Sequence, residues 1–509
     1  MRIAHISDTH IGNDTFFFSK KATKRGLKLI NEAKPDIVIH TGDITGHGLL
    51  EEYEMAKKLF RFKCPFLAVP GNHDSENVGY ELFFKFYGHR GFAEEFEKNG
   101  EKFYIVGVDT TIPDSPDGRV GEGGLEFIRE SFENAPKNGV RILTMHHHII
   151  PTFHSGREFC TVSDGGDLLQ LIIDMDINVV LSGHRHSFTV RSVKINGKKT
   201  VVINAGSLSQ ITRGFEGHSF NIVDISKNKV NISCVPVDDP PRPSSLPLKQ
   251  EHAIGNEPQL VDLGRKVATI VHIGDTHFGQ NSYVEKMFTR AVEVVKETKP
   301  DLVIVTGDIT HDGSIESLEL GKEKLSLIDA PMIVIAGDRD FRPLTVSAYH
   351  KIFGTFPKFY ESEKLAAVAL NSCLFEEKLG YIRRSRFAKA IEWLSERKDK
   401  LRILIFHHPL LPIPGAKYSG MLLNAGDILT GITSAKIDLV AFSYGHVGFG
   451  VQVDGSIISN AGNTCSKLLQ EKIEYSLNLI EIYEKAITLR EKSLMDEREK
   501  VFGPFQRPA

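Results

Sequence analysis

Short apolar runs alternate with amphipathic stretches along the first part of the chain. Residues 3–6, 36–40 and 66–69 form nearly continuous apolar runs, and Leu27 and Ile30 lie at helical spacing between the first two runs. Strands of a parallel sheet are buried on both faces and therefore appear as continuous apolar runs joined by helices. The pattern predicts an α/β fold with a buried parallel sheet.

The alternation continues through the next 130 residues or so. We expect further strands at 104–108, 141–145 and 178–181, with helices near 124–134 and from about 167. Four later runs follow one another closely, as strands of hairpins do: 188–193, 200–204, 219–225 and 230–235. We expect this end of the sheet to be antiparallel.

The order of elements then repeats after a turn-rich segment. Residues 238–265 contain the run Asp-Asp-Pro-Pro-Arg-Pro, which can continue neither a ladder nor a helix. Asp8 is matched by Asp275 at an offset of 267 residues, and the strand at 220–225 by that at 477–482 at an offset of 257. A slow drift of this kind is typical of a duplicated domain that has lost short loop segments. We expect one domain at 1–237, a linker at 238–265, a second domain at 266–490 and a charged tail at 491–509.

Composition narrows the class of protein. The 509 residues include 62 basic and 65 acidic side chains, and a net charge of −3 provides no electrostatic case for nucleic acid as the main partner. Five dispersed cysteines without a C-x-x-C spacing are typical of a reduced, intracellular chain. The first strand begins near residue 2, which leaves no room for a signal peptide, and no run approaches the ~20 apolar residues of a membrane span. We expect a cytoplasmic protein with no membrane partner.

Polar residues suited to metal binding follow the expected strands of the first copy. They are Asp8, His10, Asp43, Asn72, His146, His184 and His186. Carboxyl ends of parallel strands meet at one edge of a sheet, so three oxygen and four imidazole donors would gather there. Two divalent ions sharing Asp43 would suit such a set, and manganese, iron, zinc or cobalt accept mixed nitrogen and oxygen donors. Taken singly, each motif is also compatible with a turn or a capping residue.

The combination of these motifs resembles the calcineurin-like metallophosphoesterases. The shared pattern is D-x-H, G-D, G-N-H, a histidine in an H-H run, and G-H-x-H, here at residues 8–10, 42–43, 71–73, 146–148 and 183–186. The resemblance implies a four-layer α/β/β/α sandwich, duplicated in tandem, and two metal sites. One site would comprise Asp8, His10, Asp43 and His186, and the other Asp43, Asn72, His146 and His184.

The resemblance also implies a reaction. A hydroxide bridging the two ions would attack a phosphate ester, and His73 would be the general acid that protonates the leaving group, since an imidazole can donate a proton near neutral pH. The Gly-Asn-His-Asp and Gly-His-x-His forms look like the cyclic-nucleotide phosphodiesterase and glycerophosphodiesterase branch, which favours a small phosphodiester as substrate. A phosphomonoesterase, a nuclease or a sensor with little turnover are the alternatives. A nuclease would need a basic strip, for which the candidates are Lys20, Lys21, Lys24, Arg25 and Lys28; a solvated helix face is the competing interpretation.

Three choices within the first site stay open. His146 is favoured over His147 because it aligns with the first histidine of the second copy. His154 and Arg157 are candidates for substrate contact, with a solvated loop as the alternative. Arg185 suits either phosphate contact or exposure to water.

The second copy departs from the pattern. Its candidate residual metal site comprises Asp275, His277, Asp308, Asp338, His407 and His446. Aligning the Gly-His pairs matches His446 with His184 and leaves Gly448 opposite His186, while Arg339 stands opposite His73. This alignment gives four donors to the site with Asp308, Asp338, His407 and His446, and three to the other. Because arginine cannot act as a general acid, we expect weak activity at most and one metal ion or a phosphorylated ligand; a purely structural scaffold is the alternative. The oligomeric state is left open.

Overall fold

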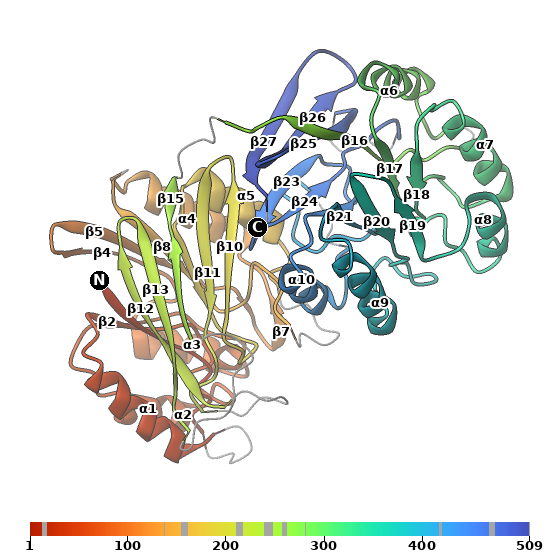
Figure 1. The fold of residues 1–509 in the computed structure, drawn as a ribbon. Helices are drawn as coiled ribbons and strands as arrows, with labels where there is room; N and C mark the ends of the chain where they lie inside the picture. The colour runs from red at the N-terminus through yellow and green to blue at the C-terminus, as the bar shows by residue number, and fades with distance from the viewer. Residues whose placement is uncertain are drawn as a thin grey trace. The chain divides into compact units, whose positions relative to one another are not determined.

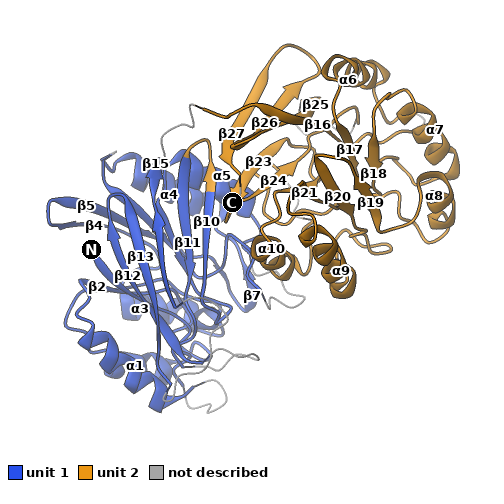
Figure 2. Ribbon diagram, in the orientation of Figure 1, with its two compact units in different colours: residues 1–193, 198–257 blue, residues 194–197, 258–509 orange. Residues whose placement is uncertain are grey.

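The computed structural model describes residues 1–12, 18–136, 138–153, 161–209, 217–238, 248–256, 262–279, 281–416, 420–467 and 474–507. The chain forms two compact units, which Figure 2 distinguishes by colour. Unit 1 comprises residues 1–193 and 198–257, and unit 2 comprises residues 194–197 and 258–509.

The first sheet of unit 1 carries three of the expected strands side by side. Its strands run in the order β14-β13-β12-β1-β2-β3. Their bounds are β1 (Arg2–Ile6), β2 (Ile37–His40), β3 (Phe66–Ala68), β12 (Ser219–Ser226), β13 (Lys229–Pro236) and β14 (Lys249–Ala253). Strands β1, β2 and β3 are parallel to one another, and β12 is antiparallel to β1.

The second sheet of unit 1 runs in the order β10-β11-β9-β8-β5-β4, with a short strand, β15, paired to β11. The bounds are β4 (Phe92–Lys98), β5 (Glu101–Gly107), β8 (Val140–Thr144), β9 (Val179–Ser182), β10 (Thr189–Ile195), β11 (Lys198–Asn204) and β15 (Gly255–Asn256). A separate hairpin joins β6 (Thr111–Ile112) and β7 (Ser115–Gly118). Strands β5, β8, β9 and β11 are parallel.

Apolar side chains explain why the two sheets pack face to face. One buried cluster combines Ile3 and Ile39 from the first sheet with Ile105 and Ile142 from the second. The helices cover the outer faces: α1 (Lys20–Glu32), α2 (Leu50–Leu59), α3 (Gly79–Tyr87), α4 (Gly121–Glu133) and α5 (Gly165–Asp174), with a 3-10 turn η1 (His73–Ser75). Ile30 of α1, for example, packs with residues of β1 and β2 on the other side of the first sheet. These layers form the α/β/β/α sandwich that the sequence predicts.

Unit 2 repeats the same strand orders. Its first sheet is β27-β26-β25-β16-β17-β18 and its second is β23-β24-β22-β21-β20-β19. The bounds are β16 (Lys266–Gly274), β17 (Leu302–Thr306), β18 (Met332–Val334), β19 (Lys358–Glu361), β20 (Leu365–Ala369), β21 (Leu401–Ile405), β22 (Leu439–Phe442), β23 (Phe449–Val453), β24 (Ser456–Asn460), β25 (Ser476–Tyr483), β26 (Ala486–Ser493) and β27 (Glu499–Gln506). Its helices are α6 (Glu285–Thr298), α7 (Ile315–Leu325), α8 (Val346–Phe353), α9 (Arg384–Ser395) and α10 (Ala425–Ser434). Figure 1 shows α6, α7 and α8 beside the first sheet and α9 and α10 beside the second.

The structure differs from the sequence-based expectation at the ends of each unit. Part of the segment 238–265 forms β14, which pairs with β13, and part of the segment 491–509 forms β27, which pairs with β26. These two strands occupy equivalent edge positions in the two units. β14 is short and polar and so carries little of the apolar signal by which a strand is recognised from sequence. β27 contains the buried Phe502 and Phe505, but Gly503 and Pro504 between them interrupt the alternation expected of a strand.

The expectation of one antiparallel end is confirmed in part: β12 and β13 form an antiparallel pair, and β12 is antiparallel to β1. The four runs after residue 187 are divided between the two sheets, and β11 is parallel to β9. Period-2 patterning predicts a strand but not the direction of its neighbour, so the sequence could not distinguish the two arrangements.

Candidate metal centre

The predicted donors of unit 1 lie just beyond the carboxyl ends of five parallel strands. Asp8 and His10 follow β1, Asp43 follows β2, and Asn72 follows β3. The three remaining donors come from the second sheet: His146 follows β8, and His184 and His186 follow β9. Both sheets therefore contribute side chains to one site.

The first donor group comprises Asp8, His10, Asp43 and His186, whose potential ligand atoms all lie within 4.8 Å of one another. The Nε2 atom of His10 lies 3.7 Å from Oδ2 of Asp43 and 3.1 Å from Nε2 of His186. Nε2 of His186 lies 3.2 Å from Oδ1 of Asp8. These nitrogen and oxygen atoms converge on one point, as the ligands of a single cation would.

The second donor group shares Asp43 with the first. Nε2 of His146 lies 3.5 Å from Oδ2 of Asp43 and 3.1 Å from Oδ1 of Asn72. Nδ1 of His184 lies 3.0 Å from the same amide oxygen. A buried, shared carboxylate between two groups is the arrangement expected for a pair of ions.

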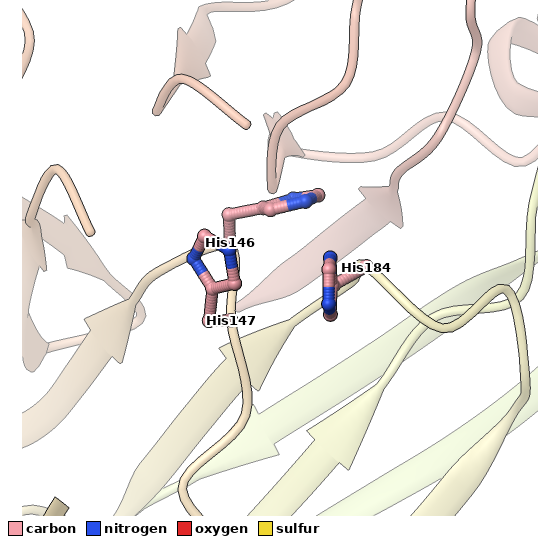
Figure 3. Close-up of side chains that lie close together, drawn as sticks. All are labelled: His146, His147 and His184. Carbon is pink, nitrogen blue, oxygen red and sulfur yellow. The ribbon is translucent and has the colours of Figure 1, made fainter. Parts of the chain in front are cut away.

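The environment of His147 distinguishes it from His146. His146, His147 and His184 lie together in Figure 3, and each offers a ring nitrogen to the cluster. Nδ1 of His147, however, is 2.8 Å from Oγ1 of Thr110, and its Nε2 is 3.2 Å from the carbonyl oxygen of Pro116. Both nitrogens of His147 thus have protein partners. The geometry favours His146 as the ligand.

The backbone at the donors is held in an unusual conformation. The φ angles of Asp8, His10, Asp43, His184 and His186 are 55°, 42°, 56°, 73° and 55°. Residues other than glycine rarely adopt this left-handed region, which costs about 1–3 kcal/mol per residue and is concentrated at functional sites. Here it turns each side chain out of its strand direction and towards the shared site.

A glycine permits the close approach of one donor. Gly42 has a φ of 93°, and a Cβ at this position would lie 2.5 Å from Nδ1 of His146. That same nitrogen is 2.7 Å from the carbonyl oxygen of Thr41, which accepts a hydrogen bond from it. The proton on Nδ1 leaves Nε2 of His146 as the nitrogen that faces the site.

Protonation states of the imidazoles suit metal binding. Burial lowers the pKa of His10 and of His184 well below the usual value, so both rings are neutral near pH 7 and present a lone pair. Burial also lowers the pKa of His146, but the adjacent Asp43 carboxylate outweighs this effect and raises it to about 9. A divalent cation would take the place of that proton. The donor set therefore fits a pair of borderline divalent ions.

His73 lies beside both groups. Its backbone N–H donates to Oδ1 of Asp43 at 2.9 Å, and its ring lies 4.7 Å from that of His10, centroid to centroid. Nδ1 of His73 is 2.8 Å from the carbonyl oxygen of Gly46 and 3.2 Å from Oε1 of Glu76. Burial lowers the pKa of His73, but the Asp43 and Glu76 carboxylates outweigh it, and the net shift is upward.

Two residues near His73 were missed from the sequence. Oε2 of Glu76 lies 3.2 Å from Nδ1 of His47, so one carboxylate joins two imidazoles. A histidine or glutamate in a loop can have many roles. The signal that could have found this pair is that His47 closely follows the Gly-Asp motif at 42–43 and Glu76 closely follows the Gly-Asn-His motif at 71–73.

Asp74 ties these loops together. Its carboxylate accepts hydrogen bonds from the backbone N–H groups of Gly71, Ile44 and Thr45 at 3.0, 3.0 and 2.8 Å, and from the Thr45 hydroxyl at 2.8 Å. Asp340 of unit 2 makes the same four bonds with Gly337, Ile309 and Thr310. Both units thus hold the loop after their second strand against the loop after their third.

Unit 2 aligns with unit 1 differently from what the sequence motif suggests. Ser182, the last residue of β9, pairs with Asn204 at the end of β11. In the same way Phe442, the last residue of β22, pairs with Asn460 at the end of β24. Four residues beyond Ser182 and Phe442 are His186 and His446. The strand register therefore makes His446 the counterpart of His186, and Tyr444 the counterpart of His184.

Side-chain positions agree with this register. A ligand atom of His446 lies within 4.8 Å of those of Asp275 and His277, which are the counterparts of Asp8 and His10. Tyr444 packs against His407, with ring centroids 5.6 Å apart. The sequence-based pairing of His446 with His184, and its placement with Asp308, Asp338 and His407, were wrong.

Gly448 is consequently not a lost ligand. Its counterpart is Phe188, which is buried in the core between the sheets. In unit 2 the Glu491 carboxylate lies where a Cβ of Gly448 would be and accepts a hydrogen bond from its N–H at 3.2 Å. The sequence alignment matched Gly183-His184 with Gly445-His446 because both loops contain a Gly-His pair. The ends of β9 and β22 show that these two pairs are not equivalent in the structure.

Arg339 takes the place of His73 as expected. Its Nη1 donates to the carbonyl oxygen of His311 at 3.1 Å, the counterpart of the Gly46 oxygen that His73 approaches. Nε of Arg339 lies 3.4 Å from Oδ2 of Asp308. A permanently charged guanidinium thus faces the carboxylate that corresponds to Asp43.

The remaining candidates have simpler outcomes. Lys20, Lys21, Lys24, Arg25 and Lys28 are exposed along α1, as a solvated helix face would be. Arg185 is partly buried in the loop between His184 and His186. His154 and Arg157 lie outside the described residues.

Comparison with known proteins identifies the family. The family model described as calcineurin-like phosphoesterase matches residues 1–188 and 268–447, more than two thirds of the chain. The chain belongs to the calcineurin-like phosphoesterase family, and it is a phosphoesterase with two copies of the family's fold. Members of this family generally depend on two metal ions, for which the Asp and His groups described above are candidates.

Several curated proteins are similar to parts of the chain. A probable cyclic nucleotide phosphodiesterase of Xenorhabdus bovienii is 25% identical over 257 residues, which are 46% of this chain and 100% of that protein. A probable glycerophosphodiester phosphodiesterase of Arcobacter nitrofigilis is 34% identical over 164 residues, or 29% of this chain and 57% of that protein. The 3',5'-cyclic adenosine monophosphate phosphodiesterase of Escherichia coli K12 is 24% identical over 200 residues, or 36% of this chain and 70% of that protein.

Among solved structures, a dimetal phosphatase from Danio rerio has a TM-score of 0.38 at 13% identity, covering 47% of this chain and 100% of that one. None of the helices in the described ranges combines the length and the apolar character that a bilayer crossing demands.

Proposed function

We propose that unit 1 hydrolyses a small phosphodiester with the help of two divalent ions, and that His73 is the general acid. The observation that carries the proposal is the convergence of two donor groups on the shared carboxylate of Asp43, with His73 hydrogen-bonded to that carboxylate through its backbone. A diester is favoured because the similar proteins described in the previous subsection are named as cyclic nucleotide or glycerophosphodiester phosphodiesterases.

The donors divide the work of holding the ions. Asp8, His10, Asp43 and His186 would hold one ion, and Asp43, Asn72, His146 and His184 would hold the other. When bound, two such ions polarise the phosphoryl oxygens and lower the pKa of water to supply the nucleophile. Manganese, iron, zinc and cobalt all suit these donors.

His73 supplies the proton that the leaving alkoxide needs. The Gly46 carbonyl can only accept a hydrogen bond, so it fixes a proton on Nδ1 of His73 and assigns proton transfer to Nε2. The Asp43 and Glu76 carboxylates raise the pKa of His73, which favours the protonated ring near neutral pH. An imidazolium beside the site can thus donate at the leaving oxygen.

Substrate class is tested with a chromogenic diester and its monoester. The protein is loaded with Mn²⁺, and kcat/KM is measured for bis(p-nitrophenyl) phosphate and p-nitrophenyl phosphate. A higher value for the diester supports the proposal and directs the search towards cyclic nucleotides and glycerophosphodiesters. A higher value for the monoester would instead make the protein a phosphomonoesterase.

The role of His73 is tested by its dependence on the leaving group. His73→Ala should lower kcat by about 10²- to 10⁴-fold for an alkyl diester, whose leaving alkoxide needs a proton. The loss should be smaller for a nitrophenyl diester, because nitrophenolate departs without one. Arg339→Ala is the matched control in unit 2 and should leave both rates unchanged. Equal losses for the two substrates in His73→Ala would refute the acid role.

A further inference from the structure

Unit 2 keeps counterparts of all four donors of the first group: the ligand atoms of Asp275, His277 and His446 lie within 4.8 Å of one another, and Asp308 lies next to His277. Nε2 of His277 lies 4.0 Å from Oδ1 of Asp275 and 3.5 Å from Oδ2 of Asp308. The corresponding distances from His10 to Asp8 and Asp43 are 4.0 and 3.7 Å. Two histidines and two aspartates therefore converge in both units.

The fourth donor of this group is His446. Its ring is stacked against that of His277, with centroids 5.3 Å apart, and the corresponding rings of His10 and His186 are 5.0 Å apart. Asp275, His277, Asp308 and His446 also keep the left-handed backbone of their counterparts, with φ of 51°, 48°, 37° and 63°. Such strain persists only where the surroundings or a function maintain it.

Buried polar atoms of the group lack other partners. Both ring nitrogens of His277, Nδ1 of His446 and Oδ2 of Asp275 have no hydrogen-bond partner within the described part of the chain. His277 and Asp275 are almost completely buried. Buried polar groups are nearly always satisfied, so these atoms point to a ligand that binds among them.

The second position in unit 2 has lost a donor. Tyr444 stands in place of His184, and its hydroxyl lies 3.5 Å from the carbonyl oxygen of Lys378. Asp338 and His407 remain near Asp308, within 4.8 Å through their ligand atoms. Nε of Arg339 lies 3.4 Å from Oδ2 of Asp308, the same oxygen that faces His277, so its positive charge acts on the retained donor group as well. The second position is weaker because it has three donors where the first has four.

We propose that unit 2 binds a single divalent cation through Asp275, His277, Asp308 and His446. Two imidazoles and two carboxylates suit a borderline ion such as Mn²⁺, Fe²⁺, Zn²⁺ or Co²⁺. Together with the two ions of the proposed function, the full chain then carries three ions. In unit 2 this ion lies beside an arginine in place of a general acid, so the site binds its cation without supporting rapid ester hydrolysis.

The experiment counts ions in the full-length protein. Purified chains are loaded with Mn²⁺, dialysed, and measured by native mass spectrometry and by elemental analysis. The wild-type chain should hold three ions, and His446→Ala and the milder His446→Gln should each hold two. His407→Ala, at the second position of unit 2, is the matched control and should still hold three. Circular dichroism and thermal melting show that each variant is folded.

Two results would overturn the proposal. The first is an unchanged ion count in both folded His446 variants, or loss of an ion in His407→Ala. The second is a wild-type chain with two ions in which Arg339→Ala gains a third, because the guanidinium would then be the replacement for the cation.

Diester hydrolysis is measured on the same samples and should be unchanged in the His446 variants. Loss of the proposed function would appear as inactive protein with its ion count intact, whereas failure of this inference would appear in the count alone.

Discussion

The loop after β9 in unit 1 carries His184 and His186, whereas the equivalent loop after β22 in unit 2 carries Tyr444 and His446. The strands on both sides keep the same order, and the backbone at the retained donors keeps the same strained conformation. What differs is a small number of side chains, among them Arg339 in place of His73. The comparison teaches that a strained backbone can be retained while the residues proposed for proton transfer and for holding a second ion are replaced.

The comparison is sharpest at the carboxylate that each unit places between its donor groups. Asp43→Asn should lower diesterase kcat/KM by at least about 10³-fold, because an ion contributes several kcal/mol to the stabilisation of the transition state and ~1.4 kcal/mol equals a factor of ten. Asp308→Asn should leave this activity unchanged while reducing the number of bound ions. Steady-state kinetics and elemental analysis of both variants check this, and similar activity losses in the two would place turnover in both units.

The buried carboxylates of Asp74 and Asp340 should matter equally for folding and unequally for turnover. Replacing either by asparagine exchanges an acceptor oxygen for an N–H₂ group that faces backbone donors, so we expect a loss of about 1–3 kcal/mol in the free energy of unfolding. Activity should fall only in Asp74→Asn, since only unit 1 is proposed to turn over substrate. Urea denaturation and diesterase assays measure the two effects, and undiminished stability in both variants would contradict the structural role.

A partly buried lysine in unit 2 makes stability depend on pH at a position where unit 1 has an apolar residue. By strand register, the counterpart of Lys358 in unit 1 is Phe92, and Phe92 is a buried core residue. Burial, together with Lys322, lowers the pKa of Lys358 to about 8. Below pH 8 the amine is charged in both folded and unfolded chains, so the cost of burying the charge is fully present. Between pH 8 and the usual value near ~10.4, the folded state releases its proton first and the cost fades.

Lys358→Met should therefore stabilise unit 2 at pH 7, and the gain should shrink as the pH rises above 8. The shift corresponds to at most ~3 kcal/mol, and loss of the amine's contacts with the Tyr349 and Phe356 rings reduces it, so we expect about 1 kcal/mol. Thermal melts at several pH values measure the change, with the exposed Lys389→Met as control. A gain that does not vary with pH would mean that packing, and not charge, is responsible.

The smallest effect concerns the residue that positions His73. Glu76→Gln removes the carboxylate beside Nδ1 of His73 and should lower kcat by roughly 3- to 10-fold, because it removes one charge that favours the protonated ring. KM should change little, since Glu76 is not among the proposed donors. Its counterpart in unit 2 is Arg342, and Arg342→Gln should leave kcat unchanged. A rise in KM with constant kcat in Glu76→Gln would assign Glu76 to substrate binding.

Most of the candidate site could be predicted from the sequence because each donor is found by the short stretch of residues around it. Asp8, His10, Asp43 and Asn72 each follow a buried apolar strand, and parallel strands bring their carboxyl ends together without any knowledge of tertiary contacts. The preference for His146 over His147 came from the alignment of the two copies, and the partners of His147, Thr110 and Pro116, which are distant in sequence, support it.

The correspondence between His186 and His446 could not be predicted for a related reason. A sequence alignment matches the Gly-His pairs of the two copies. The pairing of β22 with β24 instead determines where His446 lies in the structure. Strand β14 was missed because its sequence is polar, and strand β27 because Gly503 and Pro504 interrupt its apolar alternation. Local patterns therefore predicted which chemistry is present, and long-range pairing decided which residues carry it.

The four hydrogen bonds of Asp74 have a consequence for how an ion enters the site. They fasten the loop that bears Asp43 to the loop that bears Asn72, so these two donors cannot drift apart when no ion is present. Most of the conformational entropy of ligand assembly is thereby lost during folding and not during binding. A centre preorganised in this way would select a cation by its size and preferred coordination, much as a rigid chelator does, and Asp340 makes the matching bonds in unit 2.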